Sequence, residues 1–230
     1  MRLIPTSASY TGLLGLLATA LIVPRIAPVG AGLQFAIELA IVAAMVEAVR
    51  RLQARVELVI VVAVVAVLAQ SAAVMKVISD MPVWVVLNHA SSVVFLFLVL
   101  GCILVNVWRQ QSVETDTIVG GVVVYLMLGV AFAGLYQLVE FLAPGSFVVS
   151  NPEAGNWGPW EPEVGVYPRL FFFSFVTLTT LGYGDLVPAG ETAGALTSFE
   201  AVTGSLYLTI LISRLVGLHI AGSREKAARG

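Results

Sequence analysis

Long apolar segments constrain the fold of this 230-residue chain more than any other feature. Hydrophobic residues make up 59% of the chain and charged residues only 11%, whereas a soluble domain usually carries about 25% charge. A helix needs roughly 20 apolar residues to cross the hydrocarbon core of a bilayer. The sequence therefore predicts an all-α membrane protein whose six transmembrane helices cover residues 9–23, 31–49, 56–78, 83–107, 118–142 and 192–218.

The first of these segments allows a second interpretation. Arg2, the apolar stretch 12–17 and the triplet Ala18-Thr19-Ala20 have the order of a secretory signal with its cleavage site. The apolar stretch continues to Val23, which favours a retained membrane helix.

Basic residues indicate how the chain is threaded through the membrane, because cytoplasmic loops carry an excess of Lys and Arg. If both termini are cytoplasmic, most basic residues lie at or beyond the cytoplasmic helix ends, and Arg25 is the exception. We therefore expect a multi-pass plasma-membrane protein with its N- and C-termini in the cytoplasm. Residues 177–185, within the segment 143–191 between the last two helices, then enter the membrane from outside. The basic residues in question are Arg2, Arg50, Arg51, Arg55, Arg109, Arg224, Lys226 and Arg229.

A nine-residue motif in segment 143–191 is the most specific indication of function. Residues 177–185 read Thr-Leu-Thr-Thr-Leu-Gly-Tyr-Gly-Asp, and the apolar stretch that follows Pro168 predicts a short re-entrant helix over 170–179. Glycine adopts positive φ at little cost, so Gly182 and Gly184 allow successive carbonyls to point at one axis. The motif resembles the selectivity filter of potassium channels, in which four loops present carbonyls that replace the water shell of K⁺.

With its flanking helices, roughly 118–218, the motif resembles potassium channels of the six-transmembrane, single-pore-loop type, with a voltage-gated-like pore domain. One chain supplies one filter strand, so the resemblance implies a homotetramer around a central pore, with a re-entrant pore helix and filter loop between helices five and six. It also implies the ion-binding residues Thr180, Leu181, Gly182, Tyr183 and Gly184.

The same resemblance implies residues that support the filter. Phe172 and Phe173 stand where the family often has a Trp pair, and Phe cannot donate the hydrogen bond of an indole N–H. Asp185 therefore needs another partner or faces water, and we expect a less firmly braced outer filter. Glu140 resembles a family glutamate that binds backbone beside the filter; the alternative is a carboxylate that faces water or pairs with Arg169. The expected support residues are Thr177, Thr179, Asp185, Glu140, Phe172 and Phe173.

The last apolar segment holds two candidate gating residues. Gly204 lies where potassium channels often have a hinge glycine, although close helix packing explains it equally well. Glu200 is a carboxylate inside the membrane and therefore a functional candidate, which we expect to face the back of the filter rather than the pore. Arg214 is expected to extend to the inner interface.

The predicted domains are a four-helix transmembrane domain (1–110) in the position of a voltage sensor, the pore domain (111–220) and a short cytoplasmic tail (221–230). Residues 83–107 contain no Arg or Lys, the gating charges of voltage sensors, so we expect weak or no voltage dependence. Three ionisable residues are expected at similar depth in the outer leaflet of the membrane: Glu38, Lys76 and His89. They form a hypothetical intramembrane cluster in which His89 senses protons; alternatively, Lys76 extends to the interface alone and His89 bonds backbone.

The sequence thus predicts a passive potassium-selective channel and not an enzyme. Its expected partners are K⁺, membrane lipids and further copies of the chain, with no nucleic acid, no cofactor and no metal other than K⁺ in the filter. Cys102 is the single cysteine, which excludes an intrachain disulfide. Two alternatives remain: a non-selective cation channel, and a non-conducting membrane subunit or transporter in which the loop only packs.

Overall fold

A computed structural model of the chain describes residues 10–26, 31–51, 56–79, 81–110, 115–150 and 166–229. Within these ranges each of the six predicted segments is helical, and a further short helix precedes the motif. Among the described residues, α3, α4, α5 and α7 contain stretches long and apolar enough to cross a membrane. The elements are α1 (Tyr10–Ile26), α2 (Ala31–Arg51), α3 (Val56–Ile78), α4 (Pro82–Arg109), α5 (Thr115–Leu142), β1 (Phe147–Val149), α6 (Val166–Leu178), β2 (Leu186–Pro188) and α7 (Glu191–Arg229).

Prolines lie near the ends of three helices. Pro82 is the first residue of α4, where its missing N–H costs nothing. Helix α6 begins at Val166, earlier than the predicted residue 170, and Pro168 lies within its first turn. Helix α1 runs past Pro24 to Ile26, because a proline this close to a helix end removes few backbone bonds. The last helix also continues beyond its predicted end, to Arg229.

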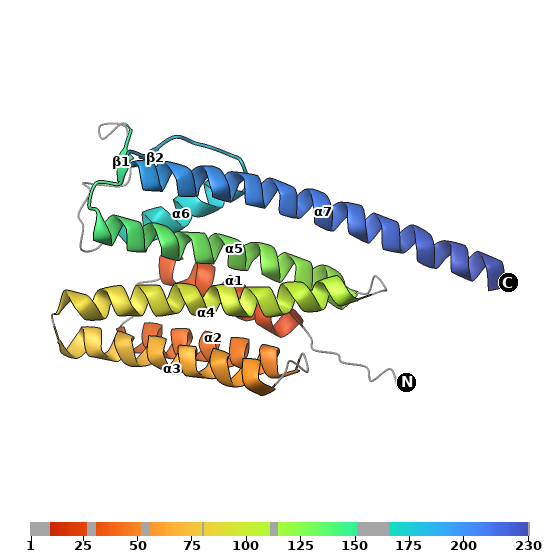
Figure 1. The fold of residues 1–230 in the computed structure, drawn as a ribbon, viewed down its shortest axis with the longest axis horizontal. Helices are drawn as coiled ribbons and strands as arrows, with labels where there is room; N and C mark the ends of the chain where they lie inside the picture. Colours follow the sequence, from red (N-terminus) through yellow and green to blue (C-terminus); the bar gives the residue numbers. More distant parts are fainter. Residues whose placement is uncertain are drawn as a thin grey trace.

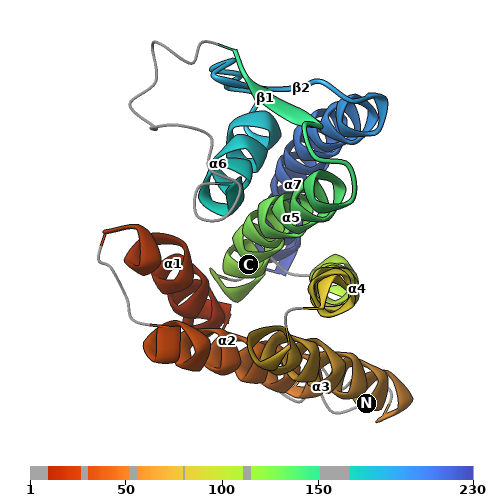
Figure 2. The same cartoon turned by 90° about the vertical axis from the view of Figure 1, so that its left-hand side faces the viewer.

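The helices run side by side along the long axis of the molecule (Figure 1). Helix α6 and the two strands gather at one end, and the C-terminal part of α7 extends beyond the other helices at the opposite end. Viewed end-on, α1 to α4 form an arc in which each helix contacts the next and both ends of the arc reach α5 (Figure 2). Helices α6 and α7 pack on α5 as well, so α5 joins the two halves of the molecule.

Glycines on three faces of α5 allow its neighbours to approach closely. A Cβ atom at Gly120 would lie 2.8 Å from a side chain of α4, one at Gly121 2.9 Å from α7, and one at Gly129 2.8 Å from α6. Small residues have this role at helix contacts in membranes. The central helix therefore carries contacts that position α6, which leads into residues 177–185.

Apolar side chains also remain on the outside of the molecule. Val67 on α3 is 67% exposed, and Phe199 and Ile212 on α7 are 63% and 58% exposed. Such surfaces require lipid or another protein chain to cover them.

Candidate ion-conduction site

The backbone of the motif alternates in handedness. Thr180, Gly182 and Gly184 have φ values of +59°, +60° and +73°, whereas Leu181 and Tyr183 between them are not in the positive-φ region. This alternation turns successive peptide groups so that their carbonyls can point to one side. The sequence predicted it at the two glycines. Thr180 was not anticipated, and positive φ at a β-branched residue is a strained conformation of the kind found at functional sites.

The start of this loop is fixed by the end of α6. The amides of Leu181 and Gly182 both donate to the carbonyl of Val176, at 2.9 and 3.4 Å, and the amide of Thr180 donates to Thr177 at 2.9 Å. The hydroxyl of Thr179 donates to the Phe175 carbonyl at 2.6 Å. The chain thus passes directly from the C-terminus of α6, with its partial negative charge, into the loop.

Two phenylalanines of α6 support the loop in different ways. The ring of Phe172 stacks on Tyr183, with the ring centroids 5.9 Å apart and the planes 6° apart. Phe173 points to the interior, where its ring lies 5.4 Å from both Tyr136 and Phe147. Phe172 therefore contacts the motif itself, while Phe173 fixes α6 to α5.

The C-terminal end of the motif is held by the segment around β1. Strands β1 and β2 pair antiparallel, with Val148 opposite Val187. Just beyond β1, the Ser150 amide donates to the Asp185 carbonyl at 3.0 Å, and its hydroxyl donates to the Gly184 carbonyl at 2.6 Å. The half-buried Asp185 lines a small pocket with Arg169 and Phe172. Ser150 thus supplies backbone contacts that sequence reasoning missed.

Glu140 supports the same region from the end of α5. Its two carboxylate oxygens accept hydrogen bonds from the amides of Gly145, at 2.8 Å, and Phe147, at 3.0 Å. The residue is 8% exposed, so it does not face water. It shapes the turn into β1, and β1 pairs with the strand that follows the motif. Its contribution to filter function stays a prediction.

Glu200 lies behind α6 and is fully buried. It contacts the hydroxyls of Tyr136 on α5 and Ser174 on α6, and Ser174 also contacts the carbonyl of Gly129 on α5. This small network links α5, α6 and α7 at one point. No lone feature of the sequence indicates Tyr136 or Ser174, because an ordinary apolar helix can contain either residue.

Gly204 lies one helical turn after Glu200, against the end of α6. A Cβ atom at this position would be 2.5 Å from the carbonyl oxygen of Leu178. The same carbonyl accepts a hydrogen bond from the hydroxyl of Tyr125 at 3.1 Å. Close packing therefore accounts for this glycine, and a role as a hinge stays a prediction.

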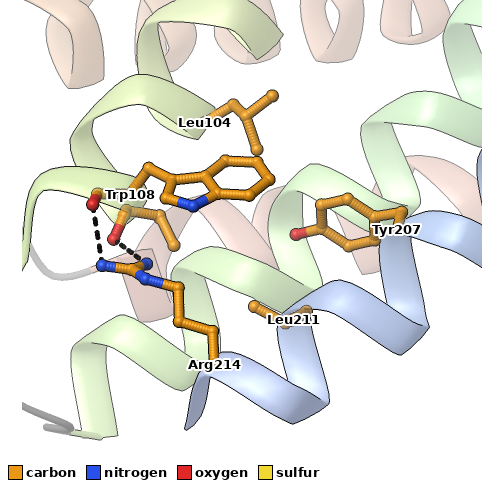
Figure 3. A pocket seen from close by; sticks show the side chains of 6 residues that line it. Leu104, Trp108, Tyr207, Leu211 and Arg214 are labelled. Carbon is orange, nitrogen blue, oxygen red and sulfur yellow. Dashed lines mark hydrogen bonds between the residues drawn. The ribbon is translucent and has the colours of Figure 1, made fainter. Parts of the chain in front are cut away.

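Arg214 of α7 binds the end of α4, and its expected extension to the inner membrane interface stays a prediction. Its guanidinium donates to the carbonyls of Val107, Trp108 and Gln110, at 2.7, 2.7 and 2.6 Å. Figure 3 shows the guanidinium bonded to two of these carbonyls, beside the ring of Trp108. Cations favour helix C-termini because the last carbonyls lack partners within the helix. Arg214 thus joins the first four helices to the last helix.

The predicted cluster of ionisable residues lies largely outside the described side chains, because those of Glu38 and Lys76 are not among them. His89 is buried, and its ring lies 6.5 Å from that of Phe141 on α5. The cluster and its proton sensing therefore stay hypotheses.

Comparison with known proteins identifies the second half of this arrangement. Residues 117–219 match the family described as "Ion channel", a range that covers nearly all of α5, the motif and the apolar part of α7. Residues 117–219 form an ion-channel domain. No solved structure matches the chain.

Curated relatives of the chain are potassium channels. It is 38% identical over 65 residues (28% of this chain, 22% of the relative) to "Two-pore potassium channel 4" from Arabidopsis thaliana. It is 34% identical over 80 residues (35% and 25%) to "Inward rectifier potassium channel Kirbac3.1" from Paramagnetospirillum magnetotacticum. It is 30% identical over 71 residues (31% and 17%) to "Voltage-gated potassium channel Kch" from Escherichia coli K12. The chain spans a quarter or less of each relative's length.

Proposed function

We propose that this chain is one subunit of a homotetrameric, potassium-selective channel that conducts K⁺ passively across the plasma membrane. The observation that carries the proposal is the alternating backbone of residues 180–184, with positive φ at Thr180, Gly182 and Gly184. Alternation of this kind lets one short strand present consecutive carbonyls to an ion. The ion-channel domain and the potassium-channel relatives support the same function.

Four copies are proposed because one loop cannot surround an ion. Every residue from Thr179 to Gly184 is exposed in the single chain. Irregular backbone at membrane depth is tolerated only inside protein or beside a water-filled cavity, and closed rotational symmetry brings identical loops to one axis. The exposed apolar residues of α7, such as Phe199 and Val202, would be covered in such an assembly.

In this proposal the carbonyls of Thr180, Leu181, Gly182 and Tyr183, with the Thr180 hydroxyl, bind K⁺ by replacing its hydration shell. Helices α1 to α5 and α7 are the six membrane spans, both termini are cytoplasmic, and the loop enters from outside. The absence of Arg and Lys from residues 83–107 favours weak voltage dependence.

Conduction can be tested with purified protein in planar lipid bilayers under K⁺ and Na⁺ gradients. We expect unitary currents whose reversal potential follows the K⁺ gradient. Gly182→Ala should abolish them, because alanine disfavours the φ of +60° at this position. Gly194→Ala is the matched control: a Cβ atom meets nothing within 4 Å at either residue, but Gly194 lies in α7 with ordinary φ.

Other outcomes would favour the alternatives. A reversal potential that responds equally to Na⁺ and K⁺ would indicate a non-selective cation channel. A monomer or dimer without unitary currents would indicate a non-conducting membrane subunit or transporter in which the loop only packs.

A further inference from the structure

The hydrogen-bond partners of Glu200 have too few protons between them if its carboxyl group is ionised. The Ser174 hydroxyl oxygen lies 2.7 Å from the Gly129 carbonyl oxygen and 2.5 Å from one carboxyl oxygen of Glu200. A hydroxyl has one proton to donate, and a carbonyl oxygen can only accept. If Ser174 donates to Gly129, the proton between Ser174 and Glu200 must come from Glu200. If Ser174 donates to Glu200, no proton lies between the Ser174 hydroxyl oxygen and the Gly129 carbonyl oxygen. These two acceptors would then face each other at 2.7 Å, which is unfavourable.

The surroundings of Glu200 also favour the neutral acid. The residue is fully buried in a helix that can span the membrane, and among the described residues no Arg, Lys or His side chain lies within ion-pair distance of it. An ionised carboxylate without a cation is costly in such a place.

Among the described residues, the titratable groups around Glu200 supply no positive charge. From α5 it faces Tyr136, which contacts its second carboxyl oxygen, and Tyr125 at longer range. The next acid along α5, Glu140, accepts from two backbone amides. From α6 its contact is the hydroxyl of Ser174.

We propose that Glu200 is a neutral carboxylic acid that donates its proton to Ser174 and accepts from Tyr136, and thereby positions α6 behind the ion-conduction loop. In this arrangement each contact has one donor and one acceptor: Glu200 donates to Ser174, Ser174 donates to Gly129, and Tyr136 donates to Glu200. Glu200 is thus a positioning residue, because it acts through α6 and touches no ion. Its importance for conduction rests on the function proposed above, whereas its protonation state does not.

Infrared difference spectra of the purified full-length protein at neutral pH test the protonation state. We expect wild type minus Glu200→Gln to show the C=O stretch of a neutral carboxyl group. Glu191→Gln, at an exposed position at the start of α7, is the matched control and should remove only carboxylate bands. A Glu200 difference spectrum with only carboxylate bands would overturn the proposal.

Ser174→Ala keeps the test decisive if Glu200→Gln does not fold. Removing the acceptor should move the neutral carboxyl band to higher frequency. A spectrum without any change in the neutral carboxyl region would overturn the proposed bond.

Ion flux into proteoliposomes tests the positioning role. Glutamine can donate to Ser174 and accept from Tyr136, so Glu200→Gln should keep the K⁺ flux within about twofold of wild type. Glu200→Ala removes both bonds and should lower the flux by about tenfold. A glutamine variant as impaired as the alanine variant would contradict this role. A neutral carboxyl band in a protein that conducts nothing would instead leave this inference standing and overturn the proposed function.

Discussion

The two halves of this molecule bury different kinds of side chain. Helices α1 to α4 have a largely aliphatic core that also contains Tyr10 and Phe95. Apart from Tyr10 with its hydroxyl, His89 is the one buried polar residue among their described side chains. The ion-channel domain buries more polar residues. Its buried polar and charged residues are Thr117, Glu140, Ser146, Arg169, Ser174 and Glu200.

This difference indicates that α1 to α4 act as a scaffold, whereas the ion-channel domain sets the geometry of the loop. Apolar helices can pack in many related arrangements, whereas a buried polar group is stable only where its hydrogen-bond partners are in place. The groups around α6, such as Glu140 and Glu200, therefore fix the geometry of the loop more narrowly than apolar contacts can. The first four helices need only contact α5 and α7.

The largest effect is expected where α7 meets the end of α6. A Cβ atom at Gly204 would lie 2.5 Å from a backbone oxygen, which cannot move without shifting the start of the loop. Gly204→Ala should destabilise the protein by about 3 kcal/mol and lower its thermal unfolding temperature in detergent. In the same helix, Gly217→Ala meets nothing within 4 Å and should leave that temperature unchanged or raise it. Equal unfolding temperatures for the two variants would refute the close contact.

Sequence reasoning was most informative where a single residue determines its own geometry. Apolar length predicted the helices, and Gly182 and Gly184 indicated positive φ because glycine favours it. The contacts that hold the loop were less visible. Ser150 is distant in sequence from Gly184, and Ser174 matters only because Gly129 and Glu200 lie beside it. Ordinary residues of this kind gain a role from tertiary placement, which no local pattern encodes.

Arg214 tests the link between the two halves. It donates to three carbonyls at the end of α4, so Arg214→Gln should lower the free energy of unfolding by about 2 kcal/mol. Arg214→Lys should retain only part of the stabilisation that Arg214 provides, because an ammonium cannot reproduce the planar fork of a guanidinium. Chemical denaturation in mixed micelles measures the free energy of unfolding of both variants. A lysine variant as stable as wild type would show that charge alone matters here.

Phe172 gives a smaller test inside the ion-channel domain. It stacks on Tyr183 and lines a pocket with Asp185, so a tryptophan here has an acceptor within the same pocket. Phe172→Trp should slow any decay of current during sustained opening by roughly fivefold, equivalent to one added hydrogen bond of about 1 kcal/mol. Phe173→Trp is the control, since Phe173 is buried against Tyr136. Unchanged decay in Phe172→Trp would count against a weakly braced outer loop.

The smallest effect is expected from a change in membrane voltage. This prediction concerns helices α1 to α4. Each elementary charge that crosses the membrane field contributes roughly 2.3 kcal/mol per 100 mV. Residues 83–107 contain no Arg or Lys, and Arg109 lies at the last residue of α4. The ratio of open to closed channels should therefore change by less than about tenfold over 100 mV, measured as macroscopic conductance in symmetrical K⁺. A steep sigmoidal conductance–voltage curve would show that the first four helices respond to voltage through charges outside residues 83–107. These helices would then take part in gating and would not be a scaffold alone.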